Sequence, residues 1–216
     1  MPFAQSYAAG QQPEAERRWA ETSAVLAALP PLSYPPMTNR LHLLFEQLDL
    51  ATEHALATAE ALGPRAHTPP VPGEWAAAQV IHHLLTTENR IVQALRKTLA
   101  ADTGALRPGS YKNRLRALLL RLALRLPGLK FKVPPLLAPP PAPETIAPLP
   151  ALRAEWAGVR RELEQVLHEF PGTKINHTVF RHPRAGWLTI GQTVTSVLDH
   201  TLHHQQQLNR IGKVLK

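Results

Sequence analysis

Residues 189–214 read TIGQTVTSVLDHTLHHQQQLNRIGKV, and this stretch decides the fold. Its apolar residues recur at spacings of three and four, which is the period of an α-helix with one buried face. His200 and His204 fall on that face, where an apolar residue is the usual occupant. The stretch therefore predicts a long helix that carries two imidazoles toward a core. The buried positions are Ile190, Val194, Val197, His200 with Thr201, His204, Leu208 and Ile211.

Three earlier segments share this helical period. They cover residues 38–62, residues 74–100, and a third stretch that starts at 144 or 149 and ends at 170. Leu and Ala dominate the composition and aromatic residues make up only 6%, which favours helix over strand. Four long helices with one long connection are typical of a four-helix bundle, so we expect an all-α fold. We interpret residues 176–186 as the loop that enters the last helix.

Two segments extend this bundle. Residues 1–37 form an N-terminal extension with a helix expected at Pro13–Leu29, ended by a proline-rich stretch. Residues 38–216 form the bundle domain. Within it, residues 103–143 are an insertion between the second and third core helices. The insertion contains an expected helix at Tyr111–Leu126 and leads into a proline-rich crossover.

The insertion accounts for the net positive charge of the whole chain. The net charge is +8, and eight of the 24 basic residues lie between Asp102 and Glu144, where there is no acidic residue. The other basic residues balance the 16 acidic ones. A helix rich in Leu and Arg either packs on the bundle or lies on an anionic membrane surface. Packing is favoured because Leu118, Leu119 and Leu120 are consecutive. Nucleic-acid binding is disfavoured, since no recognition motif accompanies the charge.

The composition also excludes some classes of function. The chain contains no cysteine, which rules out disulfides, thiolate metal sites and cysteine nucleophiles. The first 18 residues lack a basic start followed by an apolar run, so we predict no signal peptide. No uncharged apolar stretch approaches the roughly 20 residues that span a bilayer. We therefore expect a soluble, cytoplasmic protein.

Three histidines occupy core-facing positions on two helices. His200 and His204 are four residues apart, which places their Cβ atoms about 6 Å apart on one face. His83 lies on the apolar face of the second core helix. A single buried histidine is usually a hydrogen-bonded core residue. Three converging imidazoles without an ion, however, leave polar nitrogens poorly satisfied. We therefore predict a divalent-metal site at these three, and not at the neighbours His82 and His203.

Three motifs resemble those of the DinB-like (YfiT-like) metal-binding four-helix bundles. They are Trp75 eight residues before His83, the segment His182–Thr189 (HPRAGWLT), and the segment Asp199–Leu208 (DHTLHHQQQL). The resemblance covers residues 38–216, apart from the basic insertion. It implies an up-down-down-up bundle that is often dimeric, with a divalent ion held by three histidines. In this sequence those ligands are His83, His200 and His204.

Three protein ligands leave a coordination position for water or a small thiol. Zinc, nickel and iron(II) all accept imidazole ligands. The resemblance implies either a thiol-dependent transferase, a hydrolase, or a protein with no activity. We expect a metal-dependent transferase or hydrolase that acts on a small molecule and uses a low-molecular-weight thiol or water. The alternatives are a catalytically silent metal-binding protein, and a module that binds a membrane surface or a partner through the insertion.

Four further residues are candidates for contacts with the imidazoles or the substrate. Gln79 and Thr87 lie four residues before and after His83 and share its face. Glu88 lies about 140° around the helix from His83, so a structural ion pair is favoured for it. His182 precedes Pro183 in the loop before the last helix, where a role in the turn is favoured.

Overall fold

Four long helices form the bundle in the computed structural model, which describes residues 37–101, 106–125 and 141–215. They are α2 (Asn39–Glu60), α3 (Ala77–Ala100), α5 (Leu149–Glu169) and α6 (Ile190–Leu215). The expected helix at 13–29 and part of the proline-rich crossover lie outside the described residues. The domain boundary after residue 37 stays a prediction.

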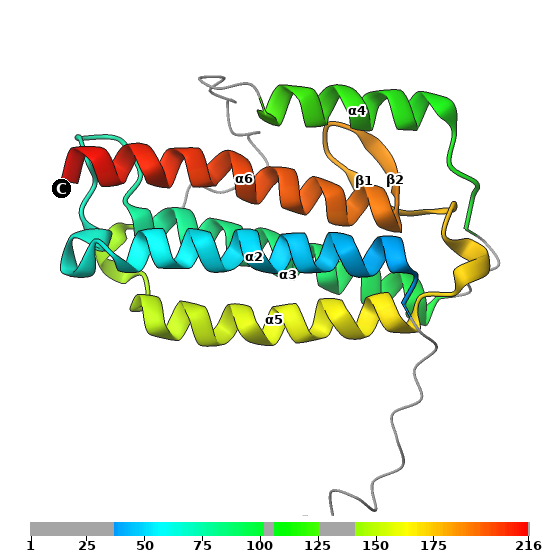
Figure 1. Ribbon diagram of the computed structural model, residues 1–216, viewed down its shortest axis with the longest axis horizontal. Helices are drawn as coiled ribbons and strands as arrows, with labels where there is room; N and C mark the ends of the chain where they lie inside the picture. The colour runs from blue at the N-terminus through cyan, green and yellow to red at the C-terminus, as the bar shows by residue number, and fades with distance from the viewer. Residues whose placement is uncertain (1–36, 102–105, 126–140, 216) are drawn as a thin grey trace, which may run out of the picture. The chain divides into compact units, whose positions relative to one another are not determined.

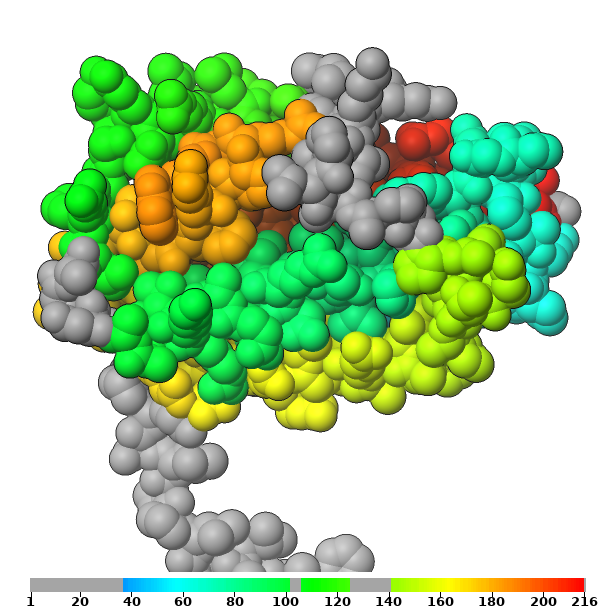
Figure 2. All heavy atoms as spheres, turned by 180° about the vertical axis from the view of Figure 1, so that it is seen from behind, coloured from blue at the N-terminus to red at the C-terminus, as the bar shows by residue number. Residues whose placement is uncertain are grey.

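The helices run up, down, down and up, as the family resemblance implied. Helices α2 and α6 share one direction, and α3 and α5 share the opposite one (Figure 1). The most extensive packing is between α2 and α6, followed by that between α3 and α5. Seen from behind, α3 lies between α5 on one side and a small hairpin on the other (Figure 2). The first and last helices are thus neighbours.

Side chains in the first turns fix where the two histidine-bearing helices begin. At the start of α6, Thr189 Oγ1 accepts from the Gln192 amide at 3.4 Å, and Gln192 Oε1 accepts from the Thr189 amide at 3.0 Å. This reciprocal pair is a capping box. At the start of α3, Gln79 Oε1 accepts from the Ala76 amide at 2.8 Å. Both helix starts are therefore set by local sequence.

The expected loop at 176–186 forms, together with residues 187–189, a two-stranded antiparallel hairpin, which the all-α expectation missed. Strand β1 (Thr178–His182) pairs with β2 (Gly186–Thr189), and Phe180 is opposite Leu188. Gly186 has a φ of 75°, a conformation that a residue with a Cβ rarely adopts. The hairpin leads directly into α6.

The basic insertion forms helix α4 (Tyr111–Arg125), close to its expected bounds, and α4 packs on α6 and β2. The segment before it is joined to the hairpin. The Arg107 carbonyl accepts from the Thr178 amide at 2.8 Å, and the Asn176 carbonyl accepts from the Gly109 amide at 2.8 Å. Because α3 and α5 are parallel, the chain must return along the bundle between them, and α4 runs in that returning direction (Figure 1). Among the described residues, every helix is too short or too polar to cross a lipid bilayer.

Candidate metal centre

The three predicted histidines converge from two helices. His83 comes from α3, and His200 and His204 come from α6. The Nε2 atoms of His83 and His200 are 3.3 Å apart, and those of His204 and His200 are 3.1 Å apart. One ring nitrogen from each of the three residues lies within 4.8 Å of the other two. The structure therefore brings together the three side chains that the sequence singled out.

The two short separations fit ligands that share one ion. Imidazole nitrogens bind divalent metals at about 2.1 Å, so neighbouring ligand atoms are about 3.4 Å apart in a tetrahedral site and about 3.0 Å apart in an octahedral one. The separations of 3.1 and 3.3 Å fall within this range. The donor set is neutral and nitrogen-only, which suits zinc, nickel or iron(II) better than magnesium or calcium.

The proton positions favour an ion as well. Gln207 Oε1 lies 2.8 Å from His204 Nδ1, so this Nδ1–H donates and the neutral ring keeps its lone pair on Nε2. His200 Nε2 faces two other ring nitrogens, yet a neutral imidazole has at most one proton there. One proton serves two such contacts poorly, whereas a cation attracts all three lone pairs.

Burial keeps the three imidazoles neutral. It lowers the pKa of His83 to about 4 and that of His204 to about 3, and nearby positive groups act in the same direction. The pKa of His200 lies well below its usual value, again chiefly because of burial. A neutral imidazole is the form that binds a metal, so the triad is ready to do so at pH 7 without losing a proton.

Trp75 packs against two of the three rings from the segment before α3. Its ring centroid is 5.2 Å from that of His83, at an interplanar angle of 63°. It is 6.3 Å from that of His204, with the two planes nearly parallel at 3°. A single indole thus restrains imidazoles from both helices.

The triad opens into a cavity of about 750 Å³. This volume is within the range of small-molecule sites, which is roughly 300–1,000 Å³. Helices α3, α4 and α6 and the hairpin all contribute to its lining. Apolar side chains form much of the walls, including Val71, Leu84, Ile91, Leu124, Phe180 and Ile211.

Several arginines line the cavity. Arg90 and Arg210 line the cavity and are also solvent-exposed, as is Arg184 on the hairpin turn. The charges of Arg90 and Arg210 contribute to the lowered pKa values of His83 and His204, so their fields reach the triad. The arrangement favours an anionic group near the mouth.

Two of the other sequence candidates, Thr87 and His182, line this cavity beside the triad, and a third, Glu88, lines it with a carboxylate that is already paired. Thr87 does so from α3, and His182 does so from the end of β1. His182 Nδ1 accepts from the backbone amides of Arg184 and Ala185, at 3.1 and 3.2 Å. Burial, together with the charge of Arg184, lowers the pKa of His182 to about 4. The neutral ring therefore keeps its proton on Nε2, so His182 both stabilises the turn and has an N–H to offer.

The remaining two candidates have structural partners. Gln79 caps α3 and donates from Nε2 to the Pro141 carbonyl at 2.9 Å, and it is not among the residues that line the cavity. Glu88 lines the cavity, but its Oε2 accepts from Trp156 and Arg160, both at 3.0 Å. Burial raises the pKa of Glu88, while Arg160 and Trp156 act in the opposite direction. The ion pair favoured from sequence is present.

Sequence reasoning missed the roles of four residues of the site. Gln207 orients His204 from three positions further along α6, and this i, i+3 spacing was a usable signal. Trp75 was noted only as part of a motif, whereas its ring contacts two imidazoles. Arg90 and Arg210 gave no local signal, because exposed arginines are common on helices.

The family model of the DinB superfamily matches residues 47–208, which contain the triad and all four bundle helices wholly or in large part. The chain belongs to the DinB superfamily. Searches among curated proteins and among solved structures gave no match. DinB-superfamily proteins are known as metal-binding bundles, and the triad of this DinB-superfamily chain could hold one ion.

Proposed function

We propose that this DinB-superfamily protein is a metal-dependent enzyme of transferase or hydrolase type. It acts on a small molecule and uses a low-molecular-weight thiol or water as the nucleophile. The observation that supports this proposal is the convergence of three Nε2 atoms in a cavity of about 750 Å³. A purely structural metal site is usually closed by four protein ligands, whereas three ligands beside a cavity leave room for a reactant.

His83, His200 and His204 would hold the ion. A bound zinc, nickel or iron(II) ion supplies Lewis acidity, which lowers the pKa of water or of a thiol bound to it. The neutral imidazoles leave the positive charge of the ion uncompensated. The only acidic side chains that line the described part of the cavity are Glu74 and Glu88, and Glu88 already pairs with Arg160. No further carboxylate of the described residues lines the cavity, which fits a site where acidity comes from an ion.

The cavity walls indicate the substrate class. Apolar side chains from several elements suit a hydrophobic body, and the exposed Arg90 and Arg210 suit a carboxylate or phosphate at one end. His182 also lines the cavity and can donate from Nε2 to a polar atom of the substrate, because its Nδ1 is already used by the turn. We therefore infer an apolar substrate or thiol with an acidic group.

Cobalt substitution tests this proposal with a spectroscopic readout. Protein purified without a His-tag is loaded with cobalt(II), and its visible absorption is recorded before and after addition of small thiols. We expect about one cobalt ion per chain, from the ligand count of one three-histidine site, and a spectral change when a thiol binds. The variant His83→Ala should lose the signal and keep its helical circular dichroism, while the adjacent variant His82→Ala should keep both.

A cobalt spectrum that does not change when thiols or simple anions such as azide are added would contradict the enzyme proposal. The protein would then be a catalytically silent metal-binding protein, the alternative recognised from sequence. Failure of the wild-type chain to bind cobalt at all would remove both functions.

A further inference from the structure

Helix α4 has an apolar stripe on its outer side that the fold does not bury. Five large apolar side chains on it are at least half exposed, with exposed fractions from 50% to 74%. At 100° per residue they fall within an arc of roughly 100° on one face of the helix. Isolated exposed leucines are common, but a continuous stripe of this kind on one helix is not. The residues are Tyr111, Leu115, Leu118, Leu119 and Leu122.

Exposed basic side chains flank this stripe on both sides. Lys112 and Arg116 lie along one edge, and Arg114 and Arg121 lie along the other, as the same helical period places them. No acidic residue occurs anywhere between Asp102 and Glu144. The outer side of α4 therefore has an apolar centre and two positive borders.

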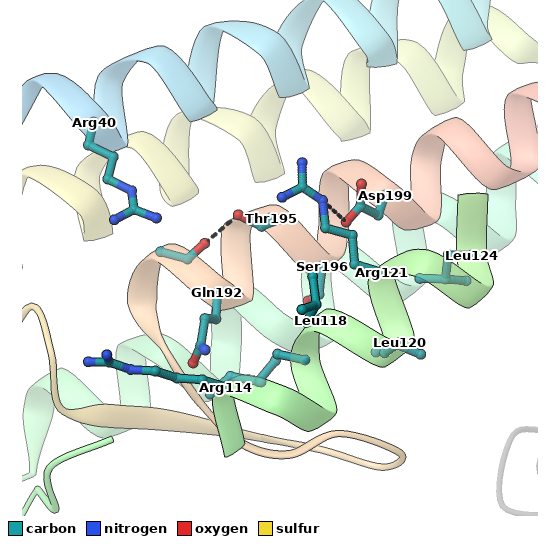
Figure 3. Close-up of a pocket in the computed structure, with 13 residues that line it drawn as sticks. Arg40, Arg114, Leu118, Leu120, Arg121, Leu124, Gln192, Thr195, Ser196 and Asp199 are labelled. Atoms are coloured by element: carbon teal, nitrogen blue, oxygen red, sulfur yellow. Dashed lines mark hydrogen bonds and ion pairs between the residues drawn. The ribbon is translucent and has the colours of Figure 1, made fainter. Parts of the chain in front are cut away.

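The inner side of α4 is already engaged with the bundle. Asn113, Ala117, Leu120 and Leu124 are partly buried, and the last three line the small cavity of about 170 Å³ between α4 and α6. Arg114, Leu118 and Arg121, at one edge of the outer side, also line this cavity. Arg121 Nε lies 3.4 Å from Asp199 Oδ2 of α6 (Figure 3).

A second link joins the C-terminal part of α4 to α6. The Leu124 carbonyl accepts from the His203 ring at 3.1 Å. The sequence favoured packing of the insertion on the bundle. This packing accounts for the inner face of α4 but not for its exposed apolar face.

We propose that the outer face of α4 binds an anionic membrane surface. The helix lies parallel to the lipid surface, the leucines insert among the acyl chains, and the basic borders contact anionic headgroups. Charge complementarity selects this occupant. A second copy of the chain fits less well, because two-fold pairing of this face would bring its basic borders together. Nucleic acid fits less well because phosphates leave the leucines unburied.

The placement also connects the membrane to the candidate site. Leu120 and Leu124 on the inner side of α4 line both the small cavity and the cavity of the histidine triad. One helix therefore separates the site from the lipid surface. This surface binding does not depend on metal or on catalysis.

Vesicle sedimentation with the full chain tests the proposal. The probes are vesicles of phosphatidylcholine with about one-quarter phosphatidylglycerol, and vesicles of phosphatidylcholine alone. We expect binding to the anionic vesicles that is at least tenfold stronger, since each basic residue near an anionic surface strengthens binding about fivefold. Because the leucines insert, part of this binding should persist at about 0.5 M salt, where the screening length is only a few Å.

Matched variants separate the contribution of the leucines to vesicle binding from that of the basic borders. Leu119→Ser with Leu122→Ser should weaken anionic-vesicle binding about tenfold. The control variant, Leu43→Ser with Leu50→Ser, changes two exposed leucines on α2. It should bind anionic vesicles as strongly as the wild type.

The charged borders have their own matched pair. Lys112→Gln with Arg116→Gln should also weaken anionic-vesicle binding at least tenfold. The control for this pair is Arg65→Gln with Arg161→Gln, two exposed arginines elsewhere on the bundle. Circular dichroism confirms that each variant is folded.

Several results would overturn the proposal. They are no preference for anionic vesicles, binding that vanishes entirely in salt, or an equal loss in the α2 control. A concentration-dependent dimer that the α4 leucine variant abolishes, with no vesicle binding by the wild type, would assign this face to a second copy instead.

Discussion

Two polar clusters in the described part of the bundle, one buried and one partly buried, differ in how their members match. In one cluster, Glu88 on α3 accepts from Trp156 and Arg160 on α5, and Arg160 also donates to Thr52 on α2 at 2.5 Å. An acid faces a base, and donors face acceptors. In the other, three neutral imidazoles present nitrogen atoms to one another.

The difference indicates which cluster is built for the fold and which for a ligand. In the Glu88–Arg160 cluster, opposite charges offset part of each other's loss of hydration, although Glu88 Oε1 and Arg160 Nη1 have no hydrogen-bond partner among the described residues. Three like acceptors gain little from one another and much from a cation. Both clusters include a residue of α3, but these are different residues, His83 and Glu88. Each cluster can therefore be changed separately within the same bundle.

The largest expected effect is on stability, from Glu88→Ala. This change leaves Arg160, whose side chain is only 8% exposed, without its nearest carboxylate. Breaking a buried ion pair on one side costs about 3–5 kcal/mol, which urea denaturation measures as a loss in the free energy of unfolding. The matched control is Glu162→Ala, which breaks the surface pair with Arg96 and should cost less than about 1 kcal/mol.

The folded Glu88→Ala protein should still bind metal with a similar affinity. Loss of metal binding from the folded variant would show that the two clusters are coupled and would break the comparison.

The second effect is the converse, a loss of metal without a loss of fold. His204→Ala removes one of three ligands and should weaken binding of zinc by more than about 100-fold, or about 2.7 kcal/mol, because even residues that only orient ligands are worth 10–100-fold. Isothermal titration with zinc measures it. His203→Ala is the control, since its Nδ1 contacts the Leu124 carbonyl and its ring only packs edge-on against that of His204, with ring centroids 5.4 Å apart. Similar losses in both variants would show that the assignment of faces on α6 is wrong.

The most gradual effect is a pH dependence of the metal-free protein. The pKa values of His83 and His204 are lowered to about 4 and about 3, so the unfolded chain binds more protons than the folded one below about pH 6.5. Stability should therefore fall as pH falls from about 6.5 to about 4, by up to about 1.4 kcal/mol per pH unit for each histidine.

Urea denaturation in chelator across this pH range measures the slope. The variant His83→Ala with His204→Ala should show a shallower slope than the wild type, whereas His54→Ala, which alters an exposed residue on α2, should not. If the free energy of unfolding has the same pH dependence in the wild type and the double variant, the triad is not the cause of that dependence.

The sequence predicted the bundle because its signal is periodic and long. The apolar face of α6 continues from Ile190 to Ile211 through His200 and His204, so one pattern gave both the helix and the direction of its imidazoles. The hairpin gave no comparable signal. Strands of five and four residues, with an irregular register between Thr178 and Phe180, are too short for a period to be recognised.

Contacts between distant segments were the other limit. Glu88 meets Trp156 and Arg160 at sequence separations of 68 and 72 residues, and no local pattern announces such partners. Gln79 shares a helix face with His83, but α3 begins at Ala77, three residues later than expected. Gln79 is therefore in the first turn, where unpaired backbone amides attract its side chain.

The ligands of the triad are far apart along the chain, and this makes a bound ion a cross-link. His83 and His200 are 117 residues apart, in a chain without cysteine. An ion that joins them closes a long loop and removes chain entropy from the unfolded state, as a disulfide does, and loop closure on this scale is worth about 5 kcal/mol in the entropic model. Unlike a disulfide, this link is not broken by reductants, whereas chelators break it by removing the ion. The thermal stability of the chain should therefore follow the concentration of free metal.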